Sequence, residues 1–213
     1  MALQQPRNHA AYPPPLEAHG LVLSRWTEEI AEQMGQWGER GFPYHPFDLG
    51  YLRDPSRRRL AVDRALAEGP HRHFVALEGE VPVGRVSVNL RDPAGLYLWS
   101  VHVPPEHEGR GVCRRMLAVL MEWLEVEYQR NDFVLTSNAF AERAHRAYFA
   151  LGFAIAETRW HFDPEIAEAL WSVDPALRSP IMEHIRYANG QWQVRTHLMR
   201  RTPGARMELG TRR

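Results

Sequence analysis

The stretch Val101-His-Val-Pro-Pro-Glu-His-Glu-Gly-Arg-Gly-Val-Cys-Arg-Arg115 decides how this chain is organised. An apolar strand ends at two prolines, two glycines follow, and a long helix begins at about Val112. The amides in the first turn of a helix have no partner within the helix, and the helix dipole adds partial positive charge beside them. Glycine has no Cβ, so a phosphate group can approach the backbone closely at Gly109 and Gly111. The segment therefore indicates a diphosphate site, although a plain tight turn uses the same glycines.

Two common phosphate-binding loops do not fit this segment. A Walker loop ends in Gly-Lys-Ser/Thr, and the chain contains no lysine, so its 26 basic side chains are all arginines. A dinucleotide-binding fingerprint needs a third glycine where Arg114 stands. The pattern therefore indicates another kind of nucleotide loop.

Hydrophobic periodicity on either side of the loop predicts alternating strands and helices. We expect helices over residues 28–35, 55–68, 112–130 and 141–151, and strands over 20–26, 73–78, 83–90, 96–103, 132–137, 153–162 and 191–200. Two further helices, 164–171 and 180–188, are expected before the last strand. The pattern predicts an α+β fold, a mostly antiparallel sheet flanked by helices, with a helical insertion over 165–190.

Composition narrows the class of protein. The net charge is zero, so no global field attracts nucleic acid or an anionic membrane. The single cysteine excludes an internal disulfide, and the histidines lack metal-site spacing, so we expect no metal. No apolar run is long enough for a secretory signal or a membrane span, which favours a cytoplasmic protein. We expect a flexible leader (1–18), one domain (19–201) and a flexible tail (202–213).

A second segment, Ala144-His-Arg-Ala-Tyr-Phe-Ala-Leu-Gly-Phe153, follows one helix and one strand later. Together the two segments resemble the GNAT superfamily of N-acetyltransferases. In that family a strand ending in Val-x-Pro leads to an Arg/Gln-x-x-Gly-x-Gly/Ala loop, and a later helix carries Tyr-x-x-x-Gly-Phe. The resemblance covers about residues 74–162 and implies an acetyltransferase (EC 2.3.1 class) that uses acetyl-CoA as its co-substrate.

The resemblance also implies roles for individual residues. The backbone of Val101 and Val103 would pair with the pantetheine arm, and the amides from Glu108 to Arg114 would hold the pyrophosphate. Asn138, at the end of the next strand, would contact the cofactor arm. The implied cofactor-binding residues are Val101, Val103, Glu108, Gly109, Arg110, Gly111, Val112, Cys113, Arg114 and Asn138.

Two positions depart from the family pattern. Glu108 stands where Arg or Gln is usual, and a carboxylate facing inward would repel phosphate, so we expect its side chain to point outward. Cys113 stands where Gly or Ala is usual, and it lies on the apolar face of the expected helix.

Catalysis needs a neutral amine and a proton for the departing thiolate. The resemblance places Tyr148 near the thioester sulphur as the proton donor. The base is open, because the strand 96–103 has no glutamate. Ser100 and His102 are its polar members and share one face by strict alternation, although a structural role for His102 stays open. Tyr97 and Trp99 are expected to line the substrate site.

The acceptor is expected to be the primary amine of a small molecule. A peptide or protein amine, or a catalytically idle acyl-CoA-binding regulatory domain, are the alternatives. The aromatic loop 37–51 occupies the stretch where relatives build their acceptor pocket. The run Arg57-Arg58-Arg59 reads either as a solvated helix face or as an anion patch. The insertion 165–190 would cap the acceptor pocket or form the interface of a homodimer.

Overall fold

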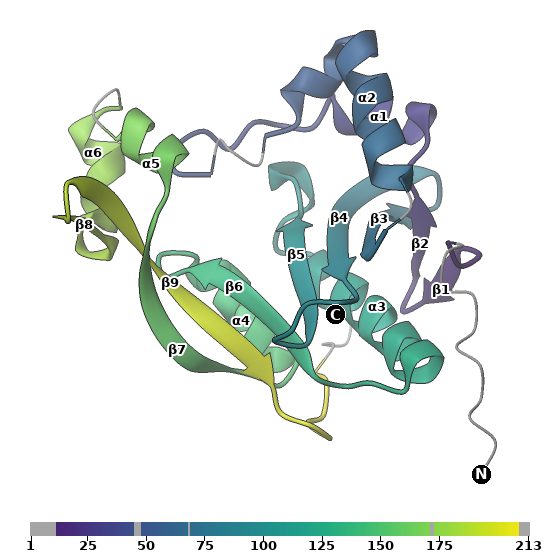
Figure 1. Cartoon of the computed structure of the whole chain (residues 1–213). Coiled ribbons are helices and arrows are strands. Elements are labelled where there is room, and N and C mark those ends of the chain that lie inside the picture. Colours follow the sequence, from purple (N-terminus) through teal and green to yellow (C-terminus); the bar gives the residue numbers. More distant parts are fainter. Residues whose placement is uncertain (1–11, 45–47, 68, 171–172, 209–213) are drawn as a thin grey trace.

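The structure, a computed structural model, describes residues 12–44, 48–67, 69–170 and 173–208 (Figure 1). Within these ranges, nine strands form one sheet in the order β1-β2-β3-β4-β5-β6-β9-β7, and β8 pairs with β9. Neighbouring strands are antiparallel except β5 and β6, which are parallel. The strands are β1 (Leu16–Ala18), β2 (Leu21–Arg25), β3 (His71–Glu78), β4 (Val81–Asn89), β5 (Leu96–His102), β6 (Phe133–Asn138), β7 (Phe153–Phe162), β8 (Ile185–Ala188) and β9 (Gln191–Arg201).

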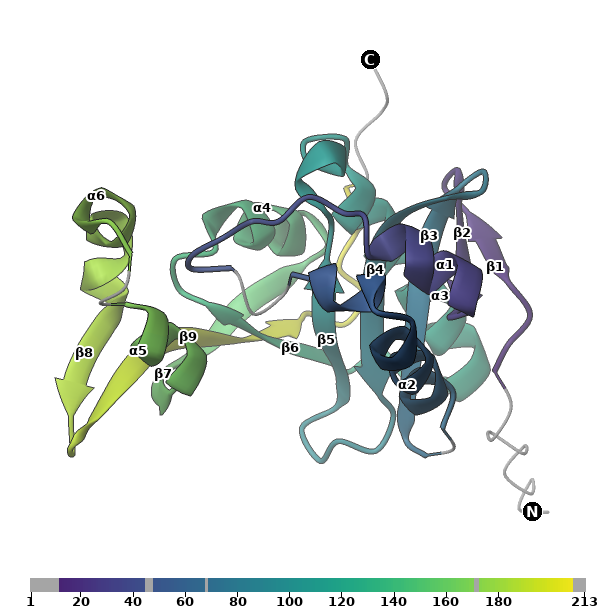
Figure 2. The same cartoon turned by 90° about the horizontal axis from the view of Figure 1, so that it is seen from above.

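Helices flank this sheet (Figure 2). Side chains cap the start of two of these helices: Thr27 Oγ1 accepts a hydrogen bond from the Ile30 amide at 3.2 Å, and Asp54 Oδ1 accepts one from the Ser56 amide at 2.8 Å. The α-helices are α1 (Glu28–Met34), α2 (Pro55–Leu66), α3 (Val112–Tyr128), α4 (Glu142–Ala150), α5 (Pro164–Ala169) and α6 (Pro175–Arg178). The described residues also form the 3-10 helices η2 (Gly50–Arg53), η3 (Pro105–His107) and η4 (Ser179–His184).

Alternating side chains of β3 divide the core into layers. Phe74 and Ala76 join the main core beneath α3, whereas Val75 packs with α1 and α2 on the opposite face. A third, smaller core is built from Phe140 and from residues of α5, η4, β8 and β9. Figure 1 shows α5, α6 and β8 gathered at one end of the β7–β9 ribbon, away from β1 to β4. We call residues 164–188 the arm.

The arm differs from the sequence prediction in its last part. A helix was expected over residues 180–188, but η4 ends at His184 and β8 follows, paired with β9. The hairpin turns at Asn189-Gly190, where φ is 53° and 76°. Two successive positive φ angles suit an Asn-Gly turn, which is why the chain reverses here. The insertion is therefore helical only as far as His184.

Both chain ends contact the domain where they are described. Leu16–Ala18 lies within the expected leader but pairs with β2. The Tyr12 hydroxyl donates to the Ala65 carbonyl at 2.5 Å. In the expected tail, the Glu208 amide donates to the Ala150 carbonyl at 2.7 Å. These contacts extend the folded part beyond the expected limits of 19 and 201; residues 1–11 and 209–213 lie outside the described ranges.

Candidate active site

The central strands β5 and β6 separate partway along their length. Their parallel pairing joins Leu96–Leu98 to Phe133–Leu135, and the described residues pair no further, although β5 continues to His102 and β6 to Asn138. A cleft of about 1360 Å³ occupies the opening. The strand edges that face this cleft are available to a ligand because the sheet itself leaves them unpaired.

A β-bulge bends β5 at the edge of the cleft. Ser100 and Val101 together stand opposite the single residue Val86 of β4. The Ser100 backbone has a φ of 52°, in the left-handed region that non-glycine residues rarely adopt. Bulges of this kind redirect side chains and end pairing, and here the bulge coincides with the divergence of β5 from β6.

The bulge also changes how the side chains of β5 alternate. Strict alternation would place Ser100 and His102 on one face, together with Leu98. Instead Leu98 and Val101 both pack on the main core, so the alternation shifts by one residue between them. His102 therefore lies on the face opposite Val101, with its ring stacked on Trp37 at a centroid distance of 5.4 Å. Ser100 lines a cavity with His73 and Arg85 on the same side of the sheet as His102, so the two side chains share a face as predicted, and only the assumed unbroken alternation is wrong.

The cleft brings together nearly all the residues predicted to form the site. Its wall includes Tyr97, Trp99, Ser100, Val101, His102, Val103, Glu108, Gly109, Gly111, Val112, Cys113, Arg114, Asn138 and Tyr148. The side chain of Arg110 lies elsewhere, since it pairs with Glu78 at 2.6 Å and contacts His107 Nδ1 at 2.7 Å. Its predicted contribution is therefore limited to its backbone.

The N-terminus of α3 opens onto this cleft without a side-chain cap. Gly109 and Gly111 both have a φ of 73°, which favours glycine. A Cβ built on Gly109 would meet nothing within 4 Å, so the space beside the backbone is open. Uncapped amides at the end of a 17-residue helix, beside open space, fit the diphosphate of acetyl-CoA.

Cationic side chains surround this loop, and one carboxylate lies among them. Glu108 was expected to turn outward, but it lines the cleft and forms ion pairs with Arg40 and Arg143, the latter at 2.6 Å. Arg40 also donates to the Val103 carbonyl. Arg114 lines the cleft and donates to the Glu208 carbonyl at 3.2 Å. The two arginines neutralise Glu108, which removes the expected repulsion of a phosphate.

Tyr148 and Cys113 are neutral groups on the cleft wall. Burial raises the pKa of Tyr148 well above its usual range, so its hydroxyl stays protonated. Burial also raises the pKa of the Cys113 thiol to about 12. A protonated thiol is a poor nucleophile, so Cys113 is unsuited to forming a covalent acyl intermediate.

His102 is buried, and this weakens it as a base. Burial, with the charges of Arg85 and Arg40, lowers the pKa of His102 to about 3. The imidazole is therefore neutral at physiological pH, but it holds an abstracted proton poorly. Its stacking on Trp37 agrees with the structural role that the sequence left open.

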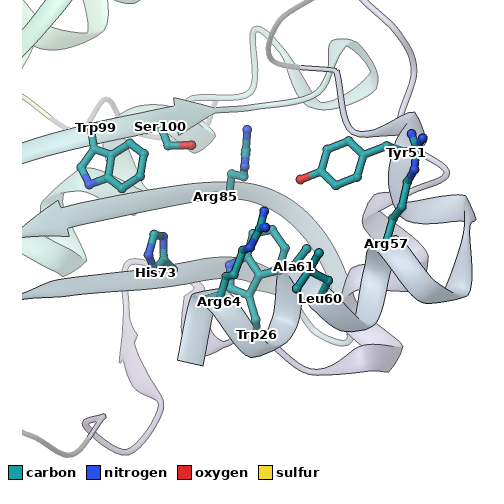
Figure 3. A pocket seen from close by; sticks show the side chains of 11 residues that line it. Trp26, Tyr51, Arg57, Leu60, Ala61, Arg64, His73, Arg85, Trp99 and Ser100 are labelled. Atoms are coloured by element: carbon teal, nitrogen blue, oxygen red, sulfur yellow. The ribbon is translucent and has the colours of Figure 1, made fainter. Parts of the chain in front are cut away.

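A second cavity, of about 380 Å³, lies beside the first (Figure 3). Trp99 and Ser100 line both cavities, whereas Tyr97 lines only the larger one. The remaining wall comes from Trp26, η2, α2, β3 and β4: Trp26, Tyr51, Arg57, Leu60, Ala61, Arg64, Ala65, His73 and Arg85. Tyr51 belongs to the aromatic loop in which an acceptor pocket was expected.

Sequence reasoning missed Arg85, Arg64 and His73 in this second cavity. One usable signal was Arg85 itself, a lone charge between apolar residues of the strand Val83 to Val88. Arg57 belongs to the arginine run for which the sequence left two interpretations open, a solvated helix face or an anion patch. Its neighbour Arg58 instead donates to the Leu52 carbonyl at 3.3 Å.

The described residues lack two kinds of feature. In the described ranges, no group of three or more His, Cys, Asp or Glu side chains is arranged to hold a metal ion. None of the helices in the same ranges has the length and apolar character needed to cross a membrane.

Comparison with known proteins identifies the fold and the family. No curated protein matches the chain in sequence. Among solved structures, a GNAT-family acetyltransferase from Bacillus anthracis is similar with a TM-score of 0.61 and 10% identity, over 88% of this chain and 97% of that one. The microcin C7 self-immunity acetyltransferase MccE, in complex with acetyl-CoA and AMP, has a TM-score of 0.58 and 10% identity, over 86% and 93%.

The spermidine/spermine N-acetyltransferase SpeG from Vibrio cholerae, in complex with manganese ions, has a TM-score of 0.54 and 14% identity, over 84% of this chain and 91% of its own. At such low sequence identity, these structural similarities show a shared fold. The model of the acetyltransferase (GNAT) family matches residues 31–153, more than half of the sequence. The opening between β5 and β6, the uncapped α3 and this match lead to one conclusion: the chain belongs to the GNAT family of acetyltransferases.

Proposed function

We propose that this protein is an acetyl-CoA-dependent N-acetyltransferase that acts on the primary amine of a small molecule. The observation that carries the proposal is the uncapped N-terminus of α3, which faces a cleft between two diverging strands. Oriented amides at such a terminus bind phosphate without reorganising. The single cysteine, which cannot form a disulfide within the chain, supports a cytoplasmic location.

When bound, acetyl-CoA supplies the acyl group as a thioester. The residues of this chain then have separate roles. The amides of Val112 to Arg114 hold the diphosphate, and the backbone of Val101 and Val103, where the chain has diverged from β6, orients the pantetheine arm. The Val103 amide polarises the carbonyl oxygen. Tyr148, kept protonated by burial, donates a proton to the departing sulphur.

The amine must lose a proton before or during its attack. His102 and Ser100 line the cleft, but the low pKa of His102 makes it a weak base. We assign both side chains to orienting the amine and a water relay to removing the proton. A His102→Ala variant should then keep the pH dependence of kcat/KM. If this variant loses the acidic limb of that profile, His102 is the base.

The small size of the second cavity favours a small acceptor over a peptide. It has a volume of about 380 Å³ and is walled by α2 and η2 as well as by the sheet. Sites for small molecules usually occupy about 300 to 1,000 Å³. A peptide acetyltransferase would need an open groove along a strand edge instead.

A thiol-release assay tests the proposed function. Purified protein and acetyl-CoA are incubated with amino acids, aminoglycosides, polyamines and short peptides, and free coenzyme A is measured. We expect release with one or more small amines and calorimetric binding of coenzyme A. Binding without release from any amine would favour the idle regulatory domain, and no binding would overturn both.

The quaternary structure is a separate proposal. Ile155 and Phe162 on β7 are 44% and 49% exposed, which suits a homodimer contact through this edge strand. Sedimentation velocity should give twice the chain mass of 24.6 kDa if the proposal is right. A monomer at all concentrations would refute it.

A further inference from the structure

The second cavity holds a concentration of positive charge. Three of its wall residues are arginines, namely Arg57 and Arg64 from α2 and Arg85 from β4, and among the described residues no Asp or Glu lines it. Its other ionisable wall residues are Tyr51 and His73. Burial lowers the pKa of His73 to about 4, so this side chain is neutral near pH 7. The fixed charge of the wall is therefore wholly positive.

Arg85 is the least satisfied of these cations. Its Nε atom is buried without a hydrogen-bond partner, and within the described ranges its side chain forms no ion pair. Figure 3 shows the Tyr51 hydroxyl turned toward the side chains of Arg85 and Arg64. Burial lowers the pKa of Arg85 to about 10, which leaves it charged at pH 7. Arg85 as a whole is half-buried, and a partly desolvated guanidinium without an ion-pair partner costs free energy that an anionic partner would offset.

The position of Arg85 places this positive charge close to Ser100, which also lines the cleft proposed to bind acetyl-CoA. In the β4–β5 register Arg85 stands opposite His102, so it flanks the bulge at Ser100. Neighbouring strands lie about 5 Å apart. A molecule of amino-acid size can therefore contact Arg85 while its amine lies at Ser100, where the two cavities meet.

We propose that the acceptor amine also carries an anionic group, a carboxylate or a phosphate, which Arg85 binds with help from Arg64 and Arg57. This inference rests on the proposed acetyltransferase function. Guanidinium groups bind such oxyanions through paired, charge-assisted hydrogen bonds. The same wall disfavours a polycationic acceptor such as spermidine, because like charges repel.

Matched pairs of amines test the inference. Phenylalanine is compared with phenethylamine, and O-phosphoethanolamine with ethanolamine, so that each pair differs in one anionic group. We expect kcat/KM for at least one anionic member to exceed that of its partner by roughly 10- to 100-fold, the usual effect of a charged hydrogen bond. The pair with the larger ratio of kcat/KM values shows whether the site prefers a carboxylate or a phosphate. Spermidine should be the poorer acceptor.

Two variants assign the effect to the cavity. Arg85→Gln should bring the ratio within each pair close to one, mainly through KM. Arg59→Gln removes the same charge from the exposed face of α2, where it lines neither cavity, and should leave the ratio unchanged. Because Arg85 has no structural partner in the described ranges, its replacement should leave Tm equal or higher. A fall in Tm would contradict the idea that the guanidinium awaits a ligand.

The outcomes separate this inference from the proposed function. If amines are acetylated but the anionic members have no advantage, the inference is wrong and the acetyltransferase function stands. If no amine releases coenzyme A, calorimetry with the coenzyme A-loaded protein decides the inference. Tighter binding of phenylalanine than phenethylamine, abolished by Arg85→Gln, supports it, and equal binding overturns it.

Discussion

The Tyr148 hydroxyl lines the cleft and forms no hydrogen bond with the described residues, while burial keeps it protonated. We expect Tyr148→Phe to lower kcat by about 100-fold, the contribution of a positioned general acid. The KM for acetyl-CoA should change little, because the proposed site of the diphosphate is the backbone of α3. Steady-state kinetics will measure both. Since the hydroxyl leaves no partner unpaired, Tm should stay the same; an unchanged kcat would remove Tyr148 from the mechanism.

The buried His102 should make stability depend on pH. Above about pH 6.5 its imidazole is neutral in the folded and unfolded chain, so its full contribution to stability is present. As the pH falls from 6.5 toward 3, the unfolded chain binds a proton that the folded chain does not. The free energy of unfolding then falls by up to about 1.4 kcal/mol per pH unit.

His102→Gln should remove this dependence, and urea unfolding between pH 4 and 7 will measure it. His73, whose pKa is also lowered, is unchanged in the variant, so the difference between the two proteins belongs to His102. Parallel curves for wild type and variant would show that the pKa of His102 is the same in the folded and the unfolded chain.

At the residue scale, the sequence predicted most of the cleft but not the second cavity. The glycines and Tyr148 could be placed because their spacing is local and matches a known pattern. Arg85 and Arg64 come from a strand and a helix far apart in the sequence, and only the tertiary fold brings them to one wall. The fact that both residues are arginines does not indicate that they lie close together in the fold.

The turn that leads into α3 offers a matched test of the phosphate cradle. Gly109 and Gly79 have φ angles of 73° and 62°, and a Cβ on either would meet nothing within 4 Å. Gly109→Ala and Gly79→Ala should each lower stability by about 1 to 2 kcal/mol, the cost of a left-handed alanine. Gly109 lines the cleft, whereas Gly79 lies in the β3–β4 turn.

Only Gly109→Ala should therefore raise the KM for acetyl-CoA, by about tenfold or more, a loss of about 1.4 kcal/mol. Initial-rate kinetics and chemical unfolding of the two variants will separate strain from binding. An equal KM in both would show that no ligand group approaches Gly109.

Helices and strands were predicted correctly where a single sequence pattern favoured them. They were missed where two patterns in the same segment favoured different structures. In α3 the apolar residues recur at the spacing of a helix, and no other secondary structure fits that pattern. For residues 185–188, the sequence favoured a helix ended by Gly190, but the Asn189-Gly190 pair is also a hairpin turn, and pairing with β9 decided the outcome. The bulge at Ser100 was visible only as a one-residue shift between Leu98 and Val101, which strict alternation overlooks.

In the whole molecule, the arm should open more readily than the rest. Its core is small and is completed by Val194 of β9 and by Phe140, whereas α3 packs on the main core. Local opening costs least where little apolar surface is buried. Hydrogen–deuterium exchange should therefore be faster in residues 164–188 than in α3. Equal protection would show that the arm unfolds only with the whole protein.

The short ladder between β5 and β6 has a consequence for the life of the protein in a cell. Three residue pairs of β5 and β6 join the two halves of the sheet at this point. A pantetheine arm bound between the diverging strands would add hydrogen bonds that link the two halves. Any ligand that binds only the native form shifts the balance away from unfolding in proportion to its concentration. Metabolic supply of the thioester would thus set the enzyme's own lifetime as well as its rate, and starved cells would clear the empty form first.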